Sequence, residues 1–102
     1  MSQRPDFTRT ATAEYVAASH CYETDQAGRG RAFELAVEAA LDHIASRPES
    51  HKRVEPTEFR RVVIRRFPYA PFYRLEKGRT VIHAVFHTAR NLSTLRARLG
   101  DA

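Results

Sequence analysis

The periodicity of the apolar residues changes near the middle of the chain, and this change limits the fold more than any other feature. Before Pro48 the apolar residues recur at steps of three and four, which is the spacing of one helix face. After residue 58 they alternate with polar residues, as they do in a half-buried β-strand. A chain that is first helical and then strand-forming predicts an α+β domain in which helices cover a sheet.

Two helices are predicted in the first half of the chain. The first begins near Thr10 or Thr12, either of which can serve as its N-cap. The second occupies residues 31–48 and ends at Pro48. The two glycines of AGRG (27–30) permit a tight reversal, so the helices form an antiparallel hairpin. The apolar stripe of the second helix consists of Phe33, Val37, Ala40, Leu41 and Ile44.

Three strands are predicted over residues 59–67, 70–76 and 80–87. Pro68 separates the first two, because proline cannot donate to a strand ladder. Gly78, in EKGR, marks a hairpin turn between the last two. The strands should form an antiparallel meander with the helical hairpin on one face and the other face left free.

A short segment at each end completes the predicted order, (β)ααβββ(α). Phe7 lies in an N-terminal edge strand, and Asn91 caps a C-terminal helical tail whose apolar positions are Leu92, Leu95 and Leu99. The length of 102 residues predicts a single domain over residues 1–102.

The two halves of the chain carry opposite charge. Residues 1–50 hold five Lys and Arg against eight Asp and Glu, a net charge of −3. Residues 51–102 hold twelve against four, a net charge of +8, and ten of the twelve are arginines. Arginine recognises carboxylates and phosphates through its planar donors. The basic half therefore predicts an acidic partner, protein or nucleic acid, with a merely solvated basic face as the alternative.

Several classes of protein are disfavoured. No stretch approaches the ~18 apolar residues of a membrane helix, so no membrane partner is expected. The first residues, MSQRPDFTRTA, lack the apolar segment of a secretory signal. Cys21 is the single cysteine and cannot form an internal disulfide, which agrees with a cytoplasmic location. The chain has no phosphate-binding loop and no nucleophile motif, and we expect no cofactor.

The histidines do not predict a metal site. His83 and His87 share a face of one predicted strand but lie about 13 Å apart, too far to bind one zinc ion. His20 and Cys21 are adjacent on a helix and point in different directions.

A ribonuclease without a metal needs only a base, an acid and cations that stabilise the phosphorane. The predicted sheet can bring such groups to one face, but arginines that merely cover an exposed sheet would give the same pattern. The sequence therefore permits this chemistry without specifying it. The residues concerned are Arg61, Arg65, Tyr73, Arg74, His87 and Arg90.

Three segments, taken in order, resemble the RelE/ParE superfamily of toxins from type II toxin–antitoxin systems. YETDQAGRGRAFELAVEAALDHIASRP is similar to the helical hairpin of that superfamily. RRVVIRRFPYAPFYRLE is similar to its strand pair, and VIHAVFHTAR to its last strand. The resemblance extends over roughly residues 6–95 and depends on the order and spacing of the motifs. Tyr69 and Phe72 keep the aromatic pattern and are expected to build the sheet core.

The resemblance implies a toxin that is neutralised by a cognate antitoxin from the same operon. Such an antitoxin has a DNA-binding N-terminal part, of the ribbon-helix-helix kind or similar, and a C-terminal tail that wraps the toxin. The toxin would reach operator DNA only through it. Two branches differ in target: ParE-like toxins act on DNA gyrase, whereas RelE-like toxins cut messenger RNA in the ribosome.

The positions that the resemblance assigns to a RelE-like nuclease are only partly kept. Arg61 stands for one catalytic lysine and Arg90 for the arginine of the last strand. Val63, Ala70 and Arg96 stand where a second lysine, an arginine and a C-terminal tyrosine are expected. An aliphatic side chain cannot stabilise a phosphorane, so these departures favour the ParE-like branch.

We therefore predict a ParE-like toxin that inhibits DNA gyrase and is not an enzyme. One alternative is a ribosome-dependent endoribonuclease that uses Arg61, Arg65 and Arg90. A second is a non-toxic relative that only binds the antitoxin. The predicted contact residues for target or antitoxin are Arg61, Arg65, Arg74, His87, Arg90 and Arg96.

Overall fold

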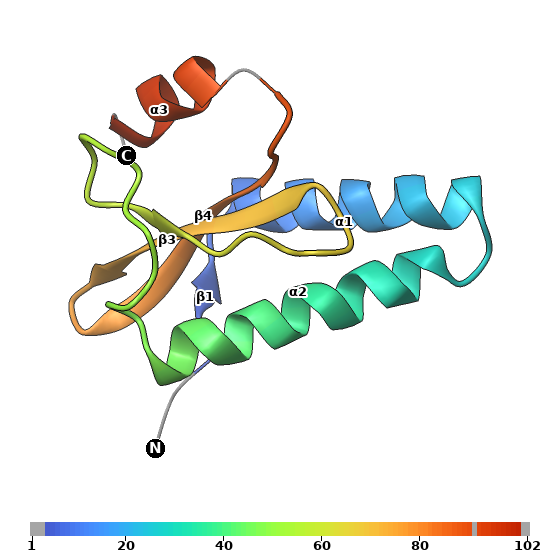
Figure 1. Ribbon diagram of the computed structural model, residues 1–102, viewed down its shortest axis with the longest axis horizontal. Helices are drawn as coiled ribbons and strands as arrows, with labels where there is room; N and C mark the ends of the chain where they lie inside the picture. Colours follow the sequence, from blue (N-terminus) through green and yellow to red (C-terminus); the bar gives the residue numbers. More distant parts are fainter. Residues whose placement is uncertain (1–3, 91, 101–102) are drawn as a thin grey trace.

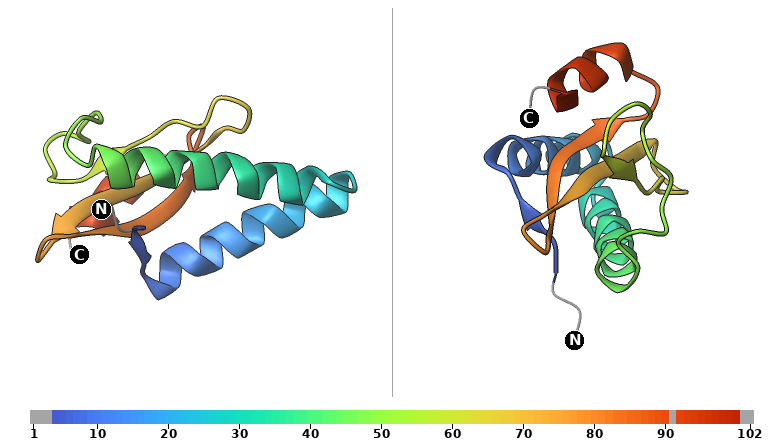
Figure 2. Two further views of the ribbon diagram at one scale, coloured as in Figure 1. Left: turned by 90° about the horizontal axis from the view of Figure 1, so that it is seen from below. Right: turned by 90° about the vertical axis from the view of Figure 1, so that its left-hand side faces the viewer.

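The order of helices and strands confirms the predicted α+β fold class. The structure, a computed structural model, describes residues 4–90 and 92–100. Figure 1 shows the two long helices together, and the right-hand view of Figure 2 shows strands β3 and β4 between α2 and the short C-terminal helix. The elements are β1 (Asp6–Phe7), α1 (Arg9–Asp25), α2 (Arg29–Ser46), β2 (Arg60–Arg61), β3 (Tyr69–Glu76), β4 (Arg79–His87) and α3 (Leu92–Gly100).

The N-cap of α1 is Thr8, so the predicted cap at Thr10 or Thr12 is wrong. The Thr8 hydroxyl accepts a hydrogen bond from the Ala11 amide at 3.1 Å. The Thr8 amide donates to the Ile82 carbonyl at 3.0 Å. The helix starts earlier than predicted because the chain leaves the sheet at this residue and needs a cap at once.

Glycine is required at two positions of the turn into α2 for different reasons: Gly28 is the N-cap, and Gly30 lies in the first turn of the helix. Gly28 has φ 90°, in the left-handed region that favours glycine. Gly30 lies so close to α1 that a Cβ there would be 2.8 Å from the Ser19 carbonyl oxygen. The Glu23 carboxylate accepts hydrogen bonds from both amides, at 3.0 and 3.1 Å. The predicted antiparallel hairpin is thus confirmed, and α2 ends two residues before Pro48.

Within the described part of the chain, the sheet has four strands in the order β1-β4-β3-β2. The turn between β3 and β4 is the predicted hairpin: Lys77 and Gly78 both have positive φ, at 52° and 78°, as in a type I′ turn. The strands β2, β3 and β4 pair antiparallel, as predicted. The N-terminal strand β1 pairs parallel to β4, so the sheet is mixed.

Most of the strand predicted over residues 59–67 is irregular, and only Arg60–Arg61 pair as β2. The alternation fails because Ile64 and Phe67 both turn toward the helices, although they are three residues apart. Phe59, which alternation places on the face of Phe67, instead packs on the opposite side of the sheet.

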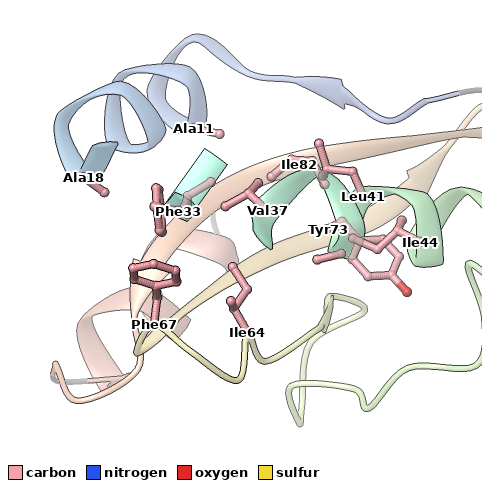
Figure 3. Close-up of a cluster of buried hydrophobic side chains, with 12 residues drawn as sticks. Ala11, Ala18, Phe33, Val37, Leu41, Ile44, Ile64, Phe67, Tyr73 and Ile82 are labelled. Carbon is pink, nitrogen blue, oxygen red and sulfur yellow. The ribbon is translucent and has the colours of Figure 1, made fainter. Parts of the chain in front are cut away.

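The main hydrophobic core lies between the helical hairpin and the sheet (Figure 3). Phe33, at the centre of the hairpin, is fully buried, and its ring meets Phe67 and Tyr69 edge-on at centroid distances of 5.4 and 5.3 Å. Tyr73 is also fully buried, and its hydroxyl donates to the Pro48 carbonyl at 2.7 Å. Burial raises the pKa of the Tyr73 phenol to about 12, so the phenol stays protonated near neutral pH.

The other face of the sheet is covered, so the prediction that it is free is wrong. Leu95 and Leu99 of α3 are buried there, and the connector before β2 adds two further residues. The apolar tail residues thus have a partner surface, which is the physical reason for the covering. The cap predicted at Asn91 lies outside the described residues. This second cluster consists of Val54, Phe59, Ala70, Phe72, Ala84, Leu95 and Leu99.

A β-bulge in β4 changes the faces of the last strand. Phe72 pairs with Ala84 and Tyr73 with Ile82, so His83 is the extra residue. His83 packs against Phe59 at a centroid distance of 5.1 Å. His87, by contrast, meets Tyr69, which packs on the hairpin core. The two histidines therefore lie on opposite faces, and the prediction that they share one is wrong.

Candidate interaction site

Arg61 and Arg96 come together although 35 positions separate them in the sequence. Both line a pocket of about 180 Å³ between α3 and the segment before β2, with Phe72 and Leu95 forming its apolar wall. The backbone amide of Arg61 donates a hydrogen bond to the Lys52 carbonyl at 3.1 Å, which fixes the main chain at this residue. The pocket offers four cationic side chains and one carboxylate, that of Glu55, around an apolar base, and this arrangement suits an acidic amphipathic segment.

His87 and Arg90 line a second pocket, of about 140 Å³, where the end of β4 meets α1. The His87 ring packs against Tyr69 at 5.1 Å, and its Nδ1 accepts a hydrogen bond from the Ala89 amide at 3.1 Å. The neutral imidazole therefore carries its proton on Nε2. Arg90 is exposed, and its guanidinium lies 6.0 Å from the centre of the Phe86 ring.

Arg74 is more constrained than the other predicted contact residues. Its Nε donates to the Glu76 carboxylate at 2.7 Å, and its guanidinium lies 4.8 Å from the Phe59 ring centre. The hydrogen bond from Arg74, together with one from His83, holds the pKa of the Glu76 carboxyl below its usual range. The pair fixes Arg74 beside a ring, so this arginine is partly neutralised before any partner arrives.

Arg65 is exposed on the irregular segment between β2 and β3. Its neighbour Arg66 and Arg29, from the start of α2, each hold a guanidinium 5.8 Å from the Phe67 ring centre. Arg29 also lies 5.2 Å from the centre of the Tyr22 ring. Sequence reasoning missed Arg29 because the helix that carries it belongs to the acidic half of the chain.

The pockets found among the described residues do not unite the three arginines of the nuclease alternative. Arg61 faces the pocket beside α3, Arg90 faces the pocket beside α1, and Arg65 lines neither. Ala70, at the position where the resemblance expects an arginine, is fully buried in the second cluster. Val63, where a lysine is expected, is 54% exposed.

A clamp between Glu14 of α1 and Arg98 of α3 was also missed. The guanidinium donates two hydrogen bonds to the carboxylate, at 2.9 and 3.1 Å, and a third to the His83 carbonyl at 3.0 Å. Glu14 also accepts from the Val85 amide at 3.1 Å. The pair could not be predicted, because its two residues are 84 positions apart and no sequence pattern indicates that they are in contact.

The described residues contain no group of three or more His, Cys, Asp or Glu that could hold a metal ion. Over the same residues, no helix has the length and apolar character needed to cross a bilayer. Cys21 is exposed on α1.

The fold and the placement of the arginines define a class: a small α+β protein with a helical hairpin on one face of the sheet and a covered opposite face. A family model described as the ParE toxin of the type II toxin–antitoxin system parDE matches residues 6–92. The chain therefore belongs to the ParE toxin family.

A solved structure supports the fold. The chromosomal ParDE TA system from P. aeruginosa contains a chain that is similar with a TM-score of 0.63 at 15% sequence identity. The match covers 84% of this chain and 96% of that one. Comparison with curated protein sequences finds no significant match.

Proposed function

We propose that this protein is a toxin that inhibits DNA gyrase in the cytoplasm and is neutralised by a cognate antitoxin. The observation that carries the proposal is the family match over residues 6–92. On this proposal the protein is not an enzyme, uses no cofactor or metal, and meets operator DNA only through an antitoxin with a ribbon-helix-helix or similar DNA-binding part.

The departures from the nuclease pattern support gyrase over messenger RNA as the target. Ala70 lies in an apolar cluster, where it offers no charge to a phosphorane. Val63 is exposed but aliphatic. Arg61 and Arg90 line different pockets, so the cations that remain do not converge on one scissile phosphate.

The antitoxin should contact the molecule on two surfaces. The first is the pocket of Arg61 and Arg96, where carboxylates of an acidic tail would meet guanidinium groups. The second is a groove of about 410 Å³ on the helical hairpin, lined by Tyr15, Val16 and Arg31 among others. Val16 is 59% exposed and offers an apolar contact for a helix. Because α3 covers the face predicted to be free, the contacts lie around the sheet rather than on it.

The direct test is a supercoiling assay with purified gyrase and relaxed plasmid. We expect the protein to abolish supercoiling without degrading RNA added to the same reaction. The variant Arg90→Ala should weaken inhibition, whereas Arg47→Ala, which removes an exposed cation at the end of α2, should not. Undiminished supercoiling at excess protein would contradict the proposal.

Antitoxin binding tests the partner separately. If carboxylates on the antitoxin meet exposed arginines, affinity should fall steeply with added salt, because salt screens exposed charges. An affinity that is independent of salt would point to an apolar interface instead.

The ribonuclease alternative is distinguished by primer extension on translated messages. Specific cuts that disappear in Arg90→Ala would establish it. Induced expression that leaves growth unchanged would instead favour the non-toxic, antitoxin-binding relative.

A further inference from the structure

Two arginines, Arg53 and Arg60, lie directly opposite each other at the edge of the sheet. They are the partners of an isolated antiparallel bridge outside the named strand pairs. Like charges at opposite positions destabilise such a pair. Within residues 4–90 and 92–100, the ion pairs include neither of these arginines. The bridge therefore places two arginines opposite each other, neither of which has an ion-pair partner among those residues.

Backbone carbonyls hold both guanidinium groups in place. Arg53 Nη2 donates to the Thr57 carbonyl at 3.0 Å, and Arg60 Nη1 donates to the His51 carbonyl at 2.8 Å. A carbonyl orients a guanidinium but does not neutralise its charge. Because each guanidinium has five N–H donors, each of the two keeps further donors for a ligand. The two groups are thus oriented before any ligand binds.

A pocket opens beside this pair. Its volume is about 340 Å³, within the range of small-molecule sites, and its lining includes Arg53, Arg60 and Arg74. Two exposed carboxylates, Glu49 and Glu58, also line it. Because these carboxylates repel a bound anion, they disfavour an occupant that carries several negative charges.

We propose that this arginine pocket is a binding site for a single phosphate group. Arg53 and Arg60 supply the principal donors, and Arg74 supplies a third positive charge beside its Glu76 partner. Phosphate accepts paired N–H bonds from guanidinium groups, and the three arginines outnumber the carboxylates of Glu49 and Glu58 in the pocket lining. Inorganic phosphate and a nucleoside monophosphate share this chemistry. The site shares Arg53 with the pocket of Arg61 and Arg96, and Arg74 is one of the predicted contact residues, but phosphate binding here does not require toxin activity.

The test is a titration followed by backbone amide NMR at constant ionic strength, with chloride replaced stepwise by inorganic phosphate. We expect saturable shifts in residues 52–60 and 73–75 and smaller changes elsewhere. A second titration with adenosine monophosphate distinguishes the sources: tighter binding than inorganic phosphate indicates a nucleotide ligand, and equal binding indicates the phosphate group alone. Shifts that are not saturable, or that spread evenly over every arginine-bearing segment, would overturn the proposal.

Variants identify the donors. Arg53→Gln and Arg60→Gln should each weaken phosphate binding about tenfold or more, since a lost charge-assisted bond contributes on that scale. Arg66→Gln removes the same charge from an exposed position outside the pocket and should leave affinity within about twofold. If Arg60→Gln fails to fold, Arg53→Lys keeps the charge but loses the planar donors and should still weaken binding. Equal loss in Arg66→Gln and Arg53→Gln would show non-specific attraction and refute the site.

Discussion

The clamp between Glu14 and Arg98 should stabilise the docking of α3, and Arg98→Ala tests this. The change removes two hydrogen bonds to the Glu14 carboxylate and one to the His83 carbonyl. The side chains of Arg98 and Glu14 are 37% and 24% exposed, between a surface pair and a buried one. We therefore expect a loss of about 1–2 kcal/mol in the free energy of unfolding, above the ~0.2–1 kcal/mol of an exposed pair.

Thermal and urea denaturation, followed by circular dichroism, measure this loss. For a domain of this size the midpoint Tm should fall by roughly 5–15 °C. Arg96→Ala is the matched control, because it removes an exposed arginine from the same helix and should change stability by less than about 0.5 kcal/mol.

A double-mutant cycle isolates the pairwise contribution. Glu14→Ala, Arg98→Ala and the double variant should give a coupling energy of about 0.5–1.5 kcal/mol. If the two single losses add to within about 0.3 kcal/mol of the loss in the double variant, the residues do not act as a clamp and the reasoning fails.

Two further predictions concern packing and titration. Gly30→Ala should lower stability by about 1–3 kcal/mol, because its Cβ would meet the Ser19 carbonyl at 2.8 Å. Gly100→Ala should not destabilise the protein, because a Cβ there meets nothing within 4 Å. If urea denaturation shows the same loss of unfolding free energy in both glycine variants, the prediction is contradicted. Tyr73→Phe should cost about 1 kcal/mol at pH 7, because the Pro48 carbonyl loses its donor. Folding raises the pKa of Tyr73 from 10.0 to about 12. The protonated phenol therefore makes its full contribution to the free energy of unfolding below pH 10, and this contribution is lost as pH rises from 10 through 12. The free energy of unfolding of the wild type should therefore fall more steeply with pH over that range than that of Tyr73→Phe. An identical pH dependence in the two proteins would show that the Tyr73 phenol does not have the raised pKa.

The helical hairpin was predictable because its signals are local. The stripe from Phe33 to Ile44, the glycines at the turn and Pro48 lie within a few helical turns of one another. The hairpin between β3 and β4 was predictable for the same reason, since Lys77 and Gly78 suffice to define its turn.

The failures arise where distant residues decide the local structure. Ile64 and Phe67 leave strand geometry because the core beneath the helices requires both side chains. The bulge at His83 depends on how β3 and β4 align, which their separate periodicities do not reveal. The covering of the second face requires Leu95 and Leu99 to find Phe59 and Phe72, which alternation alone leaves without a partner.

The candidate contact residues were predicted as a set, but their grouping was not. Arginine content and family resemblance identified Arg61, Arg90 and Arg96. Only the fold brings Arg61 beside Arg96 and separates both from Arg90. The opposed pair of Arg53 and Arg60 likewise appears only once the strand edge is formed.

The hydrogen bonds of Glu14 and Arg98 to β4 also bear on self-association. β1 pairs with β4 only at Val81 and Ile82. Beyond that point the His83 carbonyl and the Val85 amide are bonded by side chains of Arg98 and Glu14 instead of by a neighbouring strand. An unprotected strand edge is a template for pairing with another copy of the chain. Loss of α3 would therefore do more than loosen the fold: it would free the His83 carbonyl for pairing with another chain, while Glu14 of α1 still covers the Val85 amide.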